Sequence, residues 1–176
     1  MFNRESFTVE EWAEIIAAPT AVGALVVTAD PSGPMGLSGE CRAIMTSMKA
    51  YVEANAAASP LMAALLEHIT TKPSEEEEAQ LKQWAGEQQE MMKANQPKNP
   101  EDLKQLVRDK TGAALSLLRA KGASEDDINS FKAMTYSIAE AVADASKEGG
   151  FLGFGGTRVS EAEKSVLAQI KSELGI

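Results

Sequence analysis

The residues between Gly149 and Val159 have a spacing that could cradle a phosphate. They read Gly-Gly-Phe-Leu-Gly-Phe-Gly-Gly-Thr-Arg-Val and lie between two strongly helical segments. Counted from Gly150, a P-loop places its next glycine at Gly155, as here, but Gly156 stands where the lysine is required. A P-loop also follows a strand, whereas the segment before this loop is predicted to be helical. These two departures exclude a P-loop.

The same loop has an apolar character that favours a structural role. Phe151, Leu152 and Phe154 alternate with the glycines, and burying one such side chain stabilises a fold by roughly 1.5–3 kcal/mol. We therefore expect the loop to be ordered and packed onto the helices. A weaker chemical alternative is that Arg158 and the free amides near Ser160, at a helix start, hold an anion.

Two residues with reactive side chains occur once each. His68 is the only histidine and Cys41 is the only cysteine, so an intrachain disulfide, a multi-thiolate metal site and a histidine cluster are excluded. The place of His68 near a helix end favours an interaction with the terminal carbonyls over a role as a general base. Cys41 is more typical of a small buried residue than of a reactive thiolate.

Helical signals recur along the whole chain and predict the elements that must position these residues. Apolar residues follow 3.6-residue spacing, and capping boxes, proline at first helical positions and glycine at helix ends mark the boundaries. Gly122, for example, is expected to end a helix as the residue after its C-cap. The predicted helices open at or near Thr8, Pro19, Leu37, Pro60, Ser74, Asn99, Ser124 and Ser160.

This pattern predicts an all-α fold, a single domain over 1–176 that forms a bundle of about eight helices. Pro19 is expected to end the first helix, because proline lacks the N–H that a helix interior needs. Residues 26–28 (Val-Val-Thr) are also compatible with a strand. The apolar run from Trp12 to Ala29 is interrupted by Glu14 and Pro19, so we assign it to the core and not to a membrane.

One predicted helix carries a surface that could serve a partner. Leu81, Trp84, Met91 and Met92 fall on one side of the segment that opens at Ser74. Methionine and tryptophan at helical spacing can form an adaptable surface for a partner helix. The same spacing also fits a helix that packs into the core, and we favour core packing.

Two regions share an organisation that suggests a family. Ala24–Asp30 leads through a Gly/Pro loop to Ser38-Gly39-Glu40, and Ile138–Asp144 leads through the glycine loop to Ser160–Glu163. Each is an apolar helix ending in Ala-Asp, a glycine-bearing loop, and a helix that opens with serine and glutamate. This pattern resembles the tellurite-resistance TerB-like families, over about 20–45 and 128–174, although the glycine of their Ala-Asp-Gly is displaced in both units.

The resemblance implies an all-helical bacterial protein with pseudo-twofold helix pairs. The positions matching the acidic residues proposed to hold divalent cations in that family are Asp30, Glu40, Asp144 and Glu163. Carboxylates suit hard ions such as Ca²⁺ or Mg²⁺ when several oxygens converge. The local alternative is that Glu163 completes a capping box while the two aspartates bond nearby amides at helix ends, and this alternative is favoured.

The composition and charge of the chain argue against some classes of partner. The net charge of −9 and the pI near 4.7 argue against nucleic acid, whose binding depends on clustered Lys and Arg. The N-terminus lacks the features of a secretory signal, so we expect a cytoplasmic location. We predict a non-catalytic, stress-associated interaction module that binds another protein or itself. The alternative is a protein that binds a divalent cation or a small ligand through the two acidic helix-loop-helix units.

Overall fold

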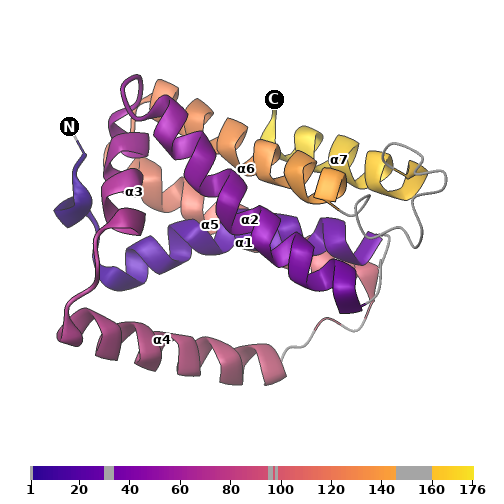
Figure 1. Ribbon diagram of the computed structural model, residues 1–176, viewed down its shortest axis with the longest axis horizontal. Coiled ribbons are helices and arrows are strands. Elements are labelled where there is room, and N and C mark those ends of the chain that lie inside the picture. Colours follow the sequence, from indigo (N-terminus) through magenta and orange to yellow (C-terminus); the bar gives the residue numbers. More distant parts are fainter. Residues whose placement is uncertain (1, 30–33, 95–96, 98, 146–159) are drawn as a thin grey trace.

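The chain folds as a bundle of helices, which confirms the predicted all-α class (Figure 1). The computed structural model describes residues 2–29, 34–94, 97, 99–145 and 160–176. Seven α-helices and no strand occur within these ranges, and a short 3₁₀ helix, η1 (Arg4–Ser6), precedes them. The helices are α1 (Val9–Ala29), α2 (Pro34–Asn55), α3 (Pro60–Thr70), α4 (Glu75–Ala94), α5 (Pro100–Ala120), α6 (Glu125–Ala145) and α7 (Glu161–Leu174).

The helix count differs from the prediction because α1 is one continuous helix through Pro19. A proline inside a helix removes one hydrogen bond and costs about 3 kcal/mol. Here the flanking Ile15, Ala18 and Val22 are almost completely buried, and their burial offsets that cost. The Thr20 hydroxyl also donates to the Ile16 carbonyl over 2.9 Å. The prediction that Pro19 ends a helix was therefore wrong, as was the strand alternative for 26–28, which lies in α1.

The core forms around α1 and α6. Helix α1 packs against α5, α6, α2 and α7, and α2 packs in turn on α6 and α3. The buried side chains are mostly aliphatic, with Trp12 and Phe131 as the largest. By length and composition α1 alone among the described helices could cross a membrane, and 44% of its most apolar window is buried inside the bundle.

Helix ends follow the signals expected from the sequence. Ser59 and Asn99 are the N-caps of α3 and α5, and a proline occupies the next position in each. At the end of α5, Gly122 has a φ of +85°, a left-handed conformation that glycine adopts without strain. The amide of Ala123 donates back to the Leu118 carbonyl over 3.0 Å, which completes a Schellman motif.

Candidate functional site

The acidic residues proposed to hold a cation are described only in part. Asp144 is exposed in the last turn of α6, and Glu163 is buried in the first turn of α7. The Glu163 carboxylate accepts from the Ser160 amide over 2.7 Å, and the Glu163 amide donates to the Ser160 hydroxyl. These bonds form a capping box, which confirms the local role that we favoured for this residue.

Convergence of these four residues around one ion stays a prediction. Asp30 and the side chain of Glu40 lie outside the described residues. Within the described part of the chain, no group of three or more His, Cys, Asp or Glu side chains is placed to hold a metal ion. The side chain of Cys41 and the glycine loop, with Phe151, Leu152 and Phe154, also lie outside what the structure describes, and so do the predictions made for them.

A buried carboxylate that the sequence did not single out joins two helices. Oδ1 of Asp127 accepts from the Ser59 hydroxyl at 2.7 Å and from the Leu61 amide at 3.1 Å, at the start of α3. Its Oδ2 accepts from the hydroxyl and the amide of Ser124, at the start of α6. Burial raises the pKa of Asp127, but these hydrogen bonds outweigh burial and hold the pKa below its ordinary value. The residue thus caps two helices at once, which is a structural role.

His68 does not have the environment expected of a general base. Its ring stacks on Trp12 with the ring centroids 4.8 Å apart, and its Nδ1 has no hydrogen-bond partner. Burial lowers the pKa of His68, the nearby Arg4 lowers it further, and Glu77 partly opposes both. The expected contact with terminal carbonyls is replaced by this aromatic stack, and the neutral imidazole serves as part of the apolar wall around Trp12.

Helix α4 differs from the other helices in its burial. Figure 1 shows it lying along the outside of the bundle, joined to α3 and α5 at its two ends, and its main contacts are with α1. None of the residues 75–91 is buried. The half-buried positions fall at helical spacing and define one face of α4: Glu77, Glu78, Leu81, Trp84 and Gln88.

The apolar residues of this face extend beyond what the bundle covers. Leu81 and Trp84 are partly buried, whereas Met91, one heptad after Trp84, is 58% exposed. We call Leu81, Trp84 and Met91 the α4 stripe. Core packing was predicted for this stripe, and for Met91 that prediction was wrong. Helical spacing identifies the apolar face of a helix, but it does not say whether another element covers that face.

Polar contacts hold α4 in place at separate points. Arg4 forms an ion pair with Glu77 at the start of the helix. Near the other end, the Lys110 ammonium of α5 donates to the Gln88 side-chain oxygen over 3.2 Å. These contacts are partly exposed, and bonds of this kind contribute only about 0–1 kcal/mol each. The position of α4 is therefore fixed weakly compared with that of the core helices.

The charge of α4 is strongly one-sided. Six glutamates and two lysines lie between Glu75 and Ala94, which gives this helix a net charge of −4. Four of the glutamates, Glu75 to Glu78, stand in the first turn, where the helix dipole favours negative charge. The α4 stripe is thus an apolar strip bordered by acidic residues.

Comparisons with known proteins give no assignment to set beside this geometry. No family model, no curated protein and no solved structure matches the chain. The resemblance to the TerB-like families therefore stays a prediction, and the function has to be argued from the molecule itself.

Proposed function

We propose that the protein is a non-catalytic interaction module whose α4 helix binds an amphipathic helix of another protein. The observation that carries the proposal is the α4 stripe, three large apolar side chains on a 20-residue helix that contributes no buried residue over 75–91. Helices in globular proteins gain most of their stability by burying an apolar face. The bundle buries this face only in part, so a partner could bury the rest of it.

The residue types of the stripe suit such an interface. Tryptophan is enriched among the residues that dominate binding energy, and methionine adapts to partners of different shape. Leu81, Trp84 and Met91 stand at positions i, i+3 and i+10, which lie along one side of a helix. A partner helix would meet this strip with apolar anchors at the same spacing, as two amphipathic helices do when they pack along their apolar faces.

The charge of α4 favours a basic partner over a second copy of this chain. Two α4 helices would bring a net charge of −4 against another −4, and like charges across an interface are unfavourable. The whole chain carries −9, which adds to the repulsion between copies. A helix with an apolar face and flanking Lys or Arg would instead gain attraction along the acidic border.

A peptide titration tests this proposal directly. The probe is a synthetic amphipathic helix with leucines on one face and lysines on its flanks. The readout is the pair of indole N–H signals in an ¹H–¹⁵N spectrum of the full chain. We expect the Trp84 signal to shift, while that of Trp12, which is 1% exposed, stays in place. Trp84→Ala should weaken binding at least tenfold, as expected for an interface anchor.

Matched controls separate the α4 stripe from general stickiness. Gln83→Ala changes an exposed neighbour on α4 and should leave the affinity within twofold. A peptide with the same leucines and glutamate flanks should bind far more weakly. Equal binding of the acidic and basic peptides, or a concentration-dependent dimer in sedimentation that Trp84→Ala abolishes, would overturn the proposal.

A further inference from the structure

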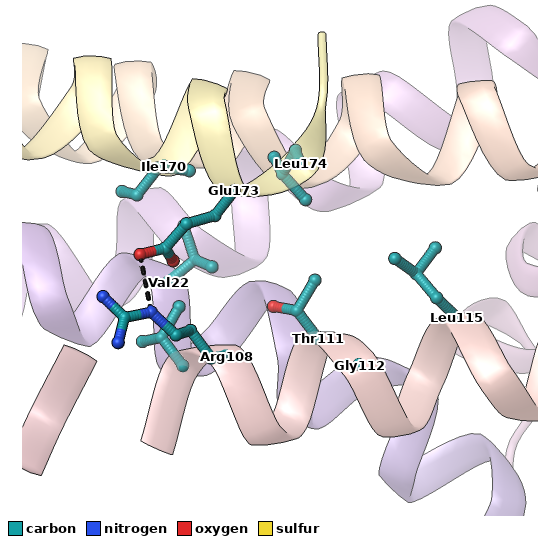
Figure 2. A pocket seen from close by; sticks show the side chains of 9 residues that line it. Val22, Arg108, Thr111, Gly112, Leu115, Ile170, Glu173 and Leu174 are labelled. Carbon is teal, nitrogen blue, oxygen red and sulfur yellow. Dashed lines mark hydrogen bonds and ion pairs between the residues drawn. The ribbon is translucent and has the colours of Figure 1, made fainter. Parts of the chain in front are cut away.

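A cavity of about 250 Å³ lies between α1, α5 and α7, away from the α4 stripe. Its wall is mostly apolar: Val22 comes from α1, Val107 and Leu115 from α5, and Ile170 and Leu174 from α7. Figure 2 shows Val22, Leu115, Ile170 and Leu174 around a space between α5 and α7. An apolar cavity of about 150 Å³ can bind benzene, so this one has room for a somewhat larger molecule.

The cavity contains one buried polar group whose bonding is incomplete. Thr111 is 7% exposed and lines the cavity from α5, and its hydroxyl oxygen has no hydrogen-bond partner. In Figure 2 its side chain extends from α5 into the space below α7. A buried hydroxyl without a partner destabilises a fold, and such a group is unusual enough in a native protein to need an explanation.

Other helical threonines show that this orientation is not forced by the helix. Each of the others in the described residues donates its hydroxyl to a backbone carbonyl of the preceding turn. These are Thr20, Thr28, Thr46, Thr70 and Thr135. Thr111 alone among them directs its oxygen away from that bond. The hydroxyl is therefore available to a molecule in the cavity, as both a donor and an acceptor.

The charges at the cavity determine what kind of molecule suits it. Arg108 and Glu173 both line it, and Nε of Arg108 donates to Oε1 of Glu173 over 3.0 Å (Figure 2). This ion pair cancels its own charge, so neither an anion nor a cation is strongly attracted. Gly112 lies beside Thr111, and apart from its chain neighbours and the backbone of its own helix no atom lies within 4 Å of where its Cβ would stand, which leaves the neighbouring space open.

We infer that this cavity binds a small neutral molecule that has an apolar body and one hydrogen-bonding oxygen. The apolar wall takes the body, and the Thr111 hydroxyl bonds the oxygen. This site differs from the α4 stripe in place and in chemistry, so the two can fail independently. Burial of the apolar body supplies most of the affinity, and Thr111 supplies the preference for a polar end.

A pair of isosteric probes tests the inference. Benzyl alcohol and ethylbenzene differ by a hydroxyl in place of a methyl. In methyl-resolved NMR titrations of the full chain, benzyl alcohol should shift the Thr111, Leu115 and Ile170 methyl signals. The ratio of the benzyl alcohol affinity to the ethylbenzene affinity should be about three- to tenfold higher in the wild type than in Thr111→Val, the factor that one hydrogen bond provides. Comparing the ratio in the two proteins cancels the difference in hydration between the probes, since valine keeps the shape of threonine and lacks the hydroxyl.

Two glycine variants provide a matched control for the location. Gly112 is exposed and lines the cavity, so Gly112→Leu adds a side chain at its rim and should weaken binding of both probes. Gly86 on α4 likewise has no atom within 4 Å of the place that a Cβ would take, so Gly86→Leu should leave binding unchanged. Absence of shifts at the cavity methyls, shifts confined to α4, or an affinity ratio that is the same in the wild type and in Thr111→Val would each overturn the inference.

Discussion

The buried Asp127 carboxylate provides the sharpest test of how the bundle is held together. It accepts four hydrogen bonds, two from the start of α3 and two from the start of α6. In Asp127→Asn one oxygen remains to serve one helix, but the new NH₂ group faces the donors of the other. Two charge-assisted hydrogen bonds are lost, and each contributes roughly 1.5–3 kcal/mol.

We therefore expect Asp127→Asn to lower the free energy of unfolding by about 3 kcal/mol at pH 7. The lower end of the range applies because neighbouring bonds are not additive. The direction in which this stability difference changes with pH follows from the lowered pKa of Asp127. Its contribution is complete above the unfolded pKa of about 3.9 and is lost as the pH falls through the lower pKa of the folded state. The difference between the variant and the wild type should shrink accordingly in acid.

Urea unfolding followed by circular dichroism, at pH 7 and at several values below pH 4, measures this difference. Asp126→Asn is the matched control, because Asp126 is the exposed neighbour in the same helical turn. It should change stability by less than about 0.5 kcal/mol. A difference for Asp127→Asn that is as small as the control, or that stays constant down to pH 2, would refute this account of the double cap.

Three further predictions concern substitutions at four sites. Gly112→Ala, with open space around the added methyl, should stabilise the fold by up to about 1 kcal/mol in urea unfolding. The same change at Gly23 places Cβ 2.6 Å from a side-chain carbon of the buried Ile44. Overpacking should therefore outweigh the higher helix propensity of alanine, and the variant should lose about 1 kcal/mol of stability. Equal changes in stability for Gly112→Ala and Gly23→Ala would contradict this. Thr111→Val should stabilise the ligand-free protein by about 1 kcal/mol, because an unpartnered hydroxyl is removed, and a lower urea midpoint would contradict that expectation. Burial lowers the pKa of His68, so its contribution to stability is present above about pH 6.5 and is lost as the pH falls. His68→Phe should therefore flatten the pH dependence of the free energy of unfolding between about pH 7 and 5. An unchanged slope would count against this expectation.

Much of the fold could be predicted because its signals are local. Helix ends are marked by hydrogen bonds within a few residues, as at the N-caps Ser59 and Asn99 and at Gly122 after the end of α5. The spacing of such residues in the sequence is therefore enough to place the helix ends. Pro19 was misassigned for the opposite reason. Its cost is local, but the burial that offsets it comes from the helices packed on α1, chiefly α5 and α6, which are distant in sequence.

The candidate sites were harder to predict because they depend on distant contacts. Asp127 was recognisable as the first-turn partner of Ser124, but its bond to Ser59 joins residues 68 positions apart. Thr111 looks like any other helical threonine in the sequence, and only the orientation of its hydroxyl in the bundle sets it apart. Met91 shows the same limit, since its spacing fits the core although the residue is exposed.

The residues that stabilise this protein and the surface that we propose binds a partner lie on different helices. The core residues lie on the other helices, around Trp12, Phe131 and Leu118, so the fold does not depend on the α4 stripe. A weakly held helix can adjust to a partner at little cost in the free energy of folding, because the core is not disturbed. Met91 is the exposed end of the α4 stripe, and a partner helix that covered it would also cover the partly buried Leu81 and Trp84. A stable core that carries one weakly attached, acidic and amphipathic helix is thus the arrangement that a binding module requires.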